Sequence, residues 1–213
     1  ADGYRIIGSS KEYLISSNID GNLTLVDFTT SKEERFDLSK TIASASFKDG
    51  ILAVLFANNE LALYDAKTKA LLFKEQGNPT VAVDNKIVAP YFKDEIVVFS
   101  TLDGKVVIVN AKANKRLRTA VVSAQDNFNN VIYLNIIDNK IISATNHKLL
   151  SLAEKEQRVA LDIRSLTTDG KNLFVATKQG EIISLTTDLY QNAKLKFPFA
   201  HFLNVVAHNG KIY

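Results

Sequence analysis

Three histidines are the side chains that could most readily carry acid–base or metal chemistry at neutral pH. They are His147, His201 and His208, and no two of them have the His-x-His or His-x-x-x-His spacing that a metal site commonly uses. His147 and His208 fall in segments rich in turn residues, and His201 follows Pro198-Phe199-Ala200. We therefore interpret all three as loop histidines with solvent partners.

Two Asp-Gly segments could be mistaken for calcium loops. Asp20-Gly21-Asn22 and Asp103-Gly104-Lys105 lack the alternating carboxylates and the Glu at the twelfth position that an EF-hand loop requires. Neither a Gly-x-Ser-x-Gly motif nor a cysteine occurs, which excludes the usual serine-hydrolase signature, a thiol nucleophile, disulfides and zinc–thiolate sites. The sequence thus carries no legible catalytic motif, and we interpret the Asp-Gly segments as hairpin turns.

Two polar segments could contact a partner instead. Residues 112–118 (KANKRLR) form the densest basic cluster. It contains Lys115, Arg116 and Arg118. A solvated outer hairpin is the plainer interpretation, and a contact for an acidic partner or a lipid head group is the alternative. Residues 123–130 (SAQDNFNN) carry one aromatic, Phe128, which either contacts a partner or fills a junction between repeats.

The elements that must position these residues follow an internal repeat. Residues 40–61 align without a gap with residues 85–106, so that Ile42 matches Ile87. The copies extend in both directions from an apolar strand that follows a turn: LTLVD (23–27), LALYD (61–65), VVIVN (106–110), LLSLA (149–153) and IISLT (182–186). Their spacing of about 33 to 45 residues is in the range of propeller blades.

Each repeat reads as four short strands separated by turns. In the second repeat these strands are expected at 41–47, 51–57, 61–66 and 71–75. Short runs of Val, Ile, Leu and Phe broken by Asp-Gly and Asn-Asn argue against helical repeats. Strands such as VVIVN are apolar on both faces, as expected where sheets are covered on both sides. We predict an all-β fold, a β-propeller of four-stranded antiparallel blades, with a flat solenoid as the structural alternative.

The repeats fill the whole chain, so we expect a single propeller domain over residues 1–213. The repeats are expected at about 4–38, 41–76, 79–122, 130–161 and 162–197, with an incomplete one at 201–213. Five repeats and the start of a sixth are therefore visible, and because an open blade exposes strand edges, the full protein is expected to have more blades. Methionine is absent even at position 1, which indicates a processed form or a fragment with any signal peptide upstream.

Composition limits the class of protein and of partner. With 46% hydrophobic residues in 213, and no stretch near the roughly 20 apolar residues of a membrane span, the sequence predicts a soluble globular domain. The net charge is +3, from 26 basic and 23 acidic residues that are interspersed. Nucleic acid is therefore not expected as a partner, and we expect a monomer.

One repeat carries a family resemblance. LALYDAKTKALLF (61–73) resembles the repeat of quinoprotein-type propellers, whose outer hairpin usually reads ALDAxTGKxxW, although Lys69 replaces the Gly and Phe73 replaces the Trp. Residues 106–118 form a weaker copy. A working quinoprotein dehydrogenase stacks its cofactor on a Trp, and this chain has none. The resemblance therefore implies the fold without the activity, and we expect no cofactor and no metal.

A second resemblance concerns function. GNPTVAVDNKIVAP (77–90) resembles the segment that opens a blade in the BamB-like lipoprotein family of the outer-membrane β-barrel assembly machinery. The resemblance implies a non-enzymatic periplasmic scaffold, held at the outer membrane by a lipidated cysteine outside this chain. It also implies a docking patch at Leu71, Phe73 and Lys74 for the barrel-forming subunit. The alternative is that Leu71 and Phe73 are ordinary core residues of a fourth strand.

The main prediction is therefore a protein-binding scaffold of outer-membrane protein assembly. Its partner would be a barrel-assembly subunit or an unfolded outer-membrane protein, bound by surface loops or by β-augmentation at a strand edge. One alternative is a surface or ligand-binding propeller lipoprotein with another role, such as adhesion. Another is an enzyme that uses the central funnel, which a cleft lined by His, Arg and Asp would favour.

Overall fold

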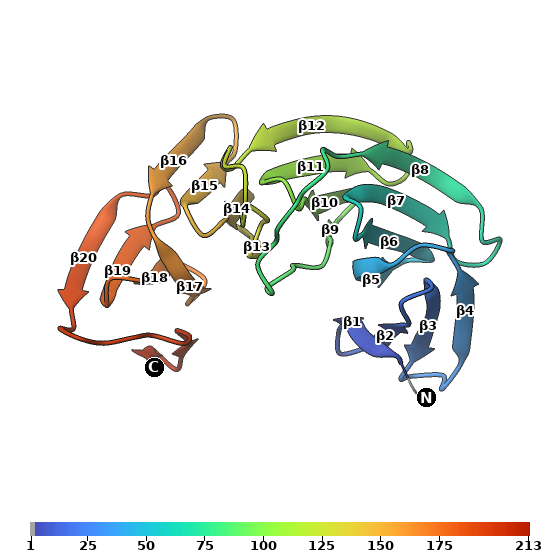
Figure 1. Cartoon of the computed structure of the whole chain (residues 1–213), viewed down its shortest axis with the longest axis horizontal. Helices are drawn as coiled ribbons and strands as arrows, with labels where there is room; N and C mark the ends of the chain where they lie inside the picture. The colour runs from blue at the N-terminus through green and yellow to red at the C-terminus, as the bar shows by residue number, and fades with distance from the viewer. Residues whose placement is uncertain (1–2) are drawn as a thin grey trace.

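A computed structural model describes residues 3–213, which fold into separate antiparallel sheets (Figure 1). Within every sheet the strands follow chain order, so each strand pairs with the next one through a hairpin. Five sheets have four strands and the sixth has two. The predicted all-β class, with five repeats and the start of a sixth, is confirmed.

The strand bounds follow the repeat closely. The first blade is β1 (Arg5–Ser9), β2 (Tyr13–Ser17), β3 (Asn22–Asp27) and β4 (Glu33–Asp37). The second is β5 (Ile42–Lys48), β6 (Ile51–Phe56), β7 (Glu60–Asp65) and β8 (Leu71–Gln76). The third is β9 (Tyr91–Lys93), β10 (Ile96–Ser100), β11 (Lys105–Asn110) and β12 (Lys115–Val121).

The remaining strands continue the same order. The fourth blade is β13 (Tyr133–Ile137), β14 (Lys140–Ala144), β15 (Lys148–Leu152) and β16 (Glu156–Ala160). The fifth is β17 (Ile163–Thr168), β18 (Asn172–Thr177), β19 (Glu181–Thr186) and β20 (Gln191–Lys196). The sixth sheet is β21 (Ala207–His208) and β22 (Lys211–Ile212). All five apolar segments that anchored the repeat coincide with third strands, although the segment 149–153 ends one residue beyond β15.

The blades stand side by side along an arc (Figure 1). The first strand of each blade lies on the inner side of the arc and the fourth strand on the outer side, while the two chain ends lie at opposite ends of the arc. Four apolar clusters fill the four junctions between consecutive complete blades. Because each inner blade is covered on both faces, strands such as β7 bury consecutive residues, and Leu61, Ala62 and Leu63 are all fully buried.

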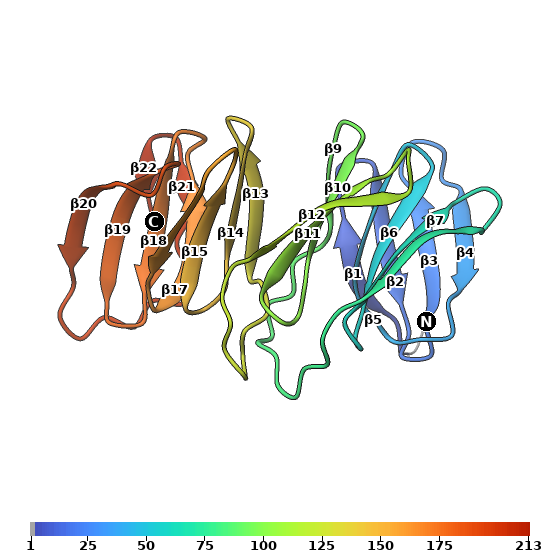
Figure 2. The same cartoon turned by 90° about the horizontal axis from the view of Figure 1, so that it is seen from above.

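The two ends of the strands differ in what they carry. The turn between the second and third strands of a blade and the link to the next blade lie at one end, which we call the connection face. The other two turns of each blade lie at the opposite end, the hairpin face. The link of residues 77–90, between the second and third blades, extends beyond the strands (Figure 2).

This link departs from the sequence alignment. The match of Ile42 with Ile87 implies a strand around Ile87, but residues 77–90 form none, and β9 begins at Tyr91. Pro90 has no N–H to donate to a ladder. The link is held by side chains of β5 instead: the Ser44 hydroxyl donates to the Val88 carbonyl at 3.1 Å, and the Ser46 hydroxyl to the Pro90 carbonyl at 2.5 Å.

A buried asparagine joins the second and third blades at the connection face. Asn59, fully buried with φ +64°, accepts the Leu102 N–H at 2.8 Å and donates to the Asp103 carboxylate at 2.8 Å. Its amide also donates to the Asn78 carbonyl. These bonds satisfy backbone groups of a turn and of a link that have no ladder partner.

A second buried asparagine, Asn129, donates to the Asp103 and Ser123 carbonyls, and a pair of glycines tests this contact. Gly104 and Gly170 both have positive φ, but a Cβ at Gly104 would collide with Asn129 Nδ2 and lie 2.6 Å from Ser123 O, whereas a Cβ at Gly170 meets nothing. We expect Gly170→Ala to cost about 1 kcal/mol for the left-handed backbone alone. Gly104→Ala should cost about 2 kcal/mol more, because it displaces hydrogen bonds of a buried amide. Urea denaturation measures both, and equal costs would contradict the account.

Candidate binding site

The seven residues predicted to bind a partner fall in two places. Leu71, Phe73 and Lys74 lie on β8, and Lys115, Arg116 and Arg118 lie on β12. These are outer strands of neighbouring blades (Figure 1). Phe128 lies apart from the other six, in the link between the third and fourth blades on the connection face.

The three β8 residues have different surroundings. Leu71 is 52% exposed. Phe73 pairs with Leu63 in the neighbouring strand and packs, half-buried, against the apolar cluster between the second and third blades. The Lys74 ammonium lies 3.2 Å from Glu60 Oε2, whose side chain is buried. Phe73 thus occupies a packing position, and Leu71 is the apolar side chain of this set that faces solvent.

The β12 arginines form ion pairs with the neighbouring blades. Arg116 Nη1 lies 2.9 Å from Glu75 Oε1 of the second blade, and Arg118 Nη2 lies 2.6 Å from Glu156 Oε1 of the fourth. Lys115 is exposed, and no ion pair involves it in the described part of the chain. Both arginines are therefore tied to adjacent blades. Exposed pairs of this kind are each worth about 0–1 kcal/mol.

Phe128 combines exposure with an unfavourable backbone. Its side chain is 53% exposed and its φ is +51°, while its N–H donates to the Ala82 carbonyl of the preceding link at 3.0 Å. A left-handed backbone costs a residue other than glycine about 1–2 kcal/mol. Phe199, on the link between the fifth and sixth sheets, is fully exposed with φ +65°. The connection face thus presents two aromatic tips whose position neither burial nor backbone preference explains.

Phe128 stands at the rim of a hollow of about 590 Å³, which we call the polar hollow. Three links, two turns and the first strand of the fifth blade contribute to it. Its lining is Asp84, Asn85, Lys86, Gln125, Asp126, Asn127, Phe128, Asn146, His147, Arg164, Lys178 and Leu203. Most of these side chains are polar, and three of them are permanent cations at neutral pH.

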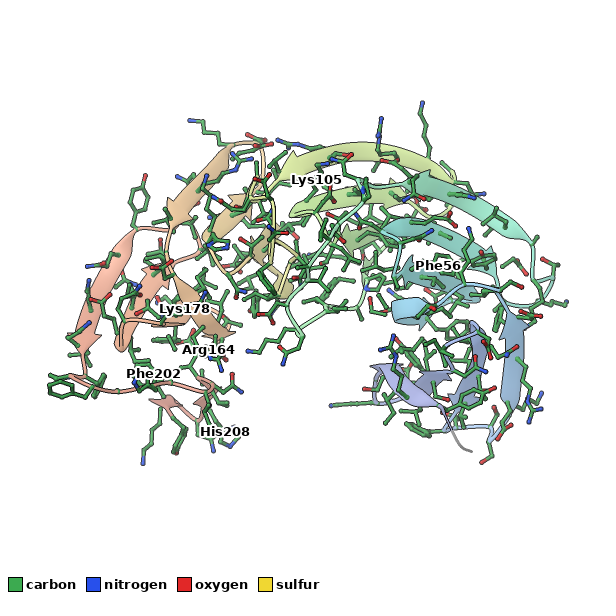
Figure 3. All side chains as sticks on the ribbon, viewed as in Figure 1. Phe56, Lys105, Arg164, Lys178, Phe202 and His208 are labelled. Carbon is green, nitrogen blue, oxygen red and sulfur yellow. The ribbon has the colours of Figure 1, made fainter. Side chains whose placement is uncertain are left out.

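The three cations come from different segments. Lys86 lies in the link of residues 77–90, and its Nζ donates to the Arg164 carbonyl at 3.4 Å. Arg164 lies on β17 and its Nε donates to the Phe202 carbonyl at 3.3 Å. Lys178 lies in the turn between β18 and β19. Figure 3 places Arg164 and Lys178 next to each other on the inner side of the fifth blade.

Asp84 organises the floor of the polar hollow. Its carboxylate accepts the Lys86 N–H and the Asn146 side-chain amide, each at 2.9 Å, and its own N–H donates to Asn130 Oδ1 at 2.6 Å. Burial alone would raise the pKa of Asp84. The hydrogen bonds from Lys86 and Asn146 and the charges of Lys86 and Arg164 outweigh burial and hold this pKa below its usual value. Asp84 is therefore an ionised structural group.

The polar hollow brings together His, Arg and Asp side chains, the set that would favour an enzyme. A catalytic set needs a base positioned by a hydrogen-bonded partner. Among residues 3–213, no hydrogen bond joins the His147 ring to a carboxylate, and Asp84 is held ionised with both oxygens engaged. His201 is exposed and His208 lies in β21, so the three histidines do not converge.

Two further features concern metals and membranes. Within the described residues, no group of three or more His, Cys, Asp or Glu side chains is placed to hold a metal ion. Over the same residues, no helix is long and apolar enough to cross a bilayer.

A separate apolar hollow of about 350 Å³ lies on the fifth blade. Ile182, Leu195, Phe197 and Tyr213 are among its lining residues, and Phe197 packs edge-on against Phe202 at 5.8 Å. It occupies the position of the blade junctions elsewhere in the arc, with the two strands of the sixth sheet on its other side. We therefore interpret it as a packing surface between blades.

Sequence reasoning singled out Phe128, which lies at the rim of the polar hollow, but not Lys86, Arg164 or Lys178. These cations are far apart in the chain and have ordinary neighbours, so no local pattern marks them. A usable signal was the pair Asn129-Asn130 directly after Phe128, because both asparagines are buried and hold the links that line the hollow.

Comparison with known proteins places the chain in a family. The model of the RSE1/DDB1/CPSF1 second beta-propeller matches residues 12–209, and the chain belongs to this family. Two solved structures share the fold. BamB from Moraxella catarrhalis matches with a TM-score of 0.68 at 12% identity, covering 98% of this chain and 80% of BamB. The computationally designed Ika8 protein matches with a TM-score of 0.72 at 17% identity, covering 96% and 65%.

Two curated relatives carry a name that states a function. Plasminogen-binding protein PgbB, from two strains of Helicobacter pylori, is 35% identical over 173 residues, which are 80% of this chain and 32% of PgbB. The chain therefore spans about a third of the length of these relatives. They are named as binding proteins and not as enzymes.

The role of Asp84 can be tested by its pH dependence. Because the folded-state pKa is lowered, the carboxylate stabilises the fold above its unfolded value of about 3.9, and this contribution is lost as pH falls through the folded-state pKa. Asp84→Asn should therefore lower the free energy of unfolding at pH 7 by about 1.5 kcal/mol. Urea denaturation should show the gap between the two proteins closing below about pH 4. A gap that is constant with pH would contradict the assignment.

Proposed function

We propose that this chain is a protein-binding module whose partner docks on the connection face. The observation that carries the proposal is Phe128, a half-exposed aromatic held in a left-handed backbone at the rim of the polar hollow. Strained residues persist where the surrounding structure holds them, and they concentrate at binding sites. Exposed aromatics on loops of a rigid scaffold are also the residues that most often dominate an interface.

We further propose plasminogen as the partner, in a protein displayed at the bacterial surface. The support is the 35% identity to plasminogen-binding protein PgbB, which extends over most of this chain. This chain matches about a third of PgbB, so the binding region of the relative can lie in the matched part or outside it. The experiment therefore has to use this chain by itself.

The test compares two phenylalanines of matched exposure. Phe128 is 53% exposed on the connection face, and Phe28 is 54% exposed in a turn of the hairpin face. We expect the chain to bind immobilised plasminogen in biolayer interferometry. Phe128→Gly should raise the dissociation constant by about tenfold or more. Glycine accepts φ +51°, so the melting temperature should stay near that of the wild type.

Phe28→Ala is the control, and it should leave plasminogen binding unchanged. Failure of the wild-type chain to bind plasminogen would overturn the choice of partner. Equal losses in Phe128→Gly and Phe28→Ala, or no loss in either, would overturn the connection face as the docking surface.

A second candidate is a periplasmic accessory of outer-membrane protein assembly. The likeness to BamB at 12% identity concerns the fold, so this candidate depends on the resemblance of residues 77–90 and of β8. The observation that favours it is Leu71, an apolar side chain 52% exposed on an outer strand. The membrane contact of such a protein would come through a lipid anchor outside this chain.

Leu71 gives a cleaner test of this candidate than Phe73, because Phe73 is half-buried against the apolar cluster between two blades. If β8 docks a barrel-assembly subunit, Leu71→Ser should weaken pull-down of the periplasmic domains of that subunit at least about tenfold. The unfolding free energy should change by less than about 0.5 kcal/mol, as for other surface positions. Leu117→Ser on β12, where Leu117 is similarly exposed, is the matched control. Unchanged pull-down with Leu71→Ser would contradict this candidate.

A further inference from the structure

We infer that the polar hollow is a carboxylate-binding subsite, which receives an acidic side chain or a C-terminal carboxylate of the docked protein. Its donors are Arg164 and Lys178, with Lys86 beside them. The inference rests on one part of the proposed function, which is that a partner protein docks on the connection face. The subsite can be tested with peptides, independently of plasminogen.

Arg164 owes its position to an irregularity in β17. The register of β17 with β18 shifts between Ile163 and Ser165, so Arg164 is the extra residue of a β-bulge. Bulges re-aim a side chain, and they are frequent next to functional sites. The second blade has a bulge at the same place in its first strand, where the extra residue is Ala43, and the first strand of the first blade has one nearby at Ile7. In these two blades the bulge carries an apolar residue, whereas in the fifth it turns a guanidinium toward the polar hollow.

Arg164 and Lys178 both keep free N–H donors in the described part of the chain. Arg164 uses Nε for the Phe202 carbonyl, while no protein acceptor takes a hydrogen bond from its Nη1 or Nη2. Lys178 Nζ likewise has no hydrogen-bond or ion-pair partner there, although its backbone N–H is bonded to Asp162 O. A guanidinium whose Nη1 and Nη2 amino groups are both free offers the planar fork that binds a carboxylate in a bidentate manner.

The charges of the polar hollow favour a singly charged ligand. Its cations are Lys86, Arg164 and Lys178, and its carboxylates are Asp84 and Asp126. The surplus is therefore one positive charge. A carboxylate would neutralise it, whereas a phosphate dianion would leave excess negative charge close to Asp84, which is held ionised.

The rim of the polar hollow favours a ligand with an apolar group next to its carboxylate. Phe128 and Leu203, the latter 79% exposed, border the polar hollow on different links. A carboxylate seated among the cations would place neighbouring groups of its own chain against these two side chains. The expected ligand is thus an acidic residue flanked by an apolar one.

Three peptides distinguish the possible carboxylates. The first is acetyl-Gly-Glu-Phe-Gly-amide, the second has Gln in place of Glu, and the third has Gln and a free C-terminal carboxylate. Binding is followed by NMR of the 15N-labelled chain, including the Arg164 Nε–H signal. We expect the first or the third peptide to bind about tenfold tighter than the neutral second one, as a charge-assisted hydrogen bond requires. Which of the two prevails identifies the source of the carboxylate.

Two variants show whether Arg164 causes the preference for the carboxylate peptides. Arg164→Gln should abolish the tenfold preference, while Lys171→Gln should keep it, because Lys171 lies in the β17–β18 turn of the same blade on the hairpin face. Melting temperatures near that of the wild type ensure that folded proteins are compared. Equal binding of all three peptides, or the same loss in both variants, overturns the subsite.

The competition arm separates carboxylate from phosphate. If inorganic phosphate displaces the bound peptide better than acetate at equal concentration, the carboxylate assignment is overturned. The subsite and the proposed function can fail separately. A plasminogen complex that is sensitive to Phe128→Gly, without any peptide preference, leaves the function standing and removes the subsite. A peptide preference without plasminogen binding leaves the subsite standing and removes plasminogen as the partner.

Discussion

Burial of both faces of each blade by its neighbours is the constraint on which the rest of this structure depends. Side chains at consecutive positions of the second and third strands, such as Val97 and Val98 of β10, enter the clusters on opposite sides of their blade and are fully buried. Such positions serve packing, and a change of even one methylene group there lowers the free energy of unfolding. Surface chemistry is therefore left to the links, the turns, the fourth strands and exposed positions of the first strands such as Arg164.

Within those limits, buried amides decide what the connection face looks like. A link such as residues 77–90 makes no ladder, so its backbone groups need other partners. Asn59 and Asn130 supply them by bonding to Asn78, Asp84 and Lys86 of this link. The same bonds fix Asp84 and the backbone of Lys86 at the polar hollow. The hollow is thus a consequence of how the links are anchored, and its rigidity follows from side chains that are themselves buried.

The strands were predictable because their signals are local. Apolar runs that follow short stretches of turn residues identified the third strand of every complete blade. In the turn after one of these strands, Asp65 accepts the backbone N–H of Thr68. The polar hollow was not predictable, because it depends on a bulge at Arg164 and on a strand, β9, that begins after Pro90. Neither a register shift nor the convergence of distant links leaves a periodic pattern in one sequence.

The aromatic residues show most clearly where fold and function separate. Phe36 is buried, with the Lys69 ammonium 3.7 Å from its ring centroid, so packing and a cation–π contact explain it. Phe128 has neither explanation, since half of its surface is in solvent and its φ of +51° suits a glycine or an asparagine better. An asparagine or glycine there would relieve the backbone. The fold alone gives no reason for an aromatic side chain at this position, whereas a docked partner would bury its ring.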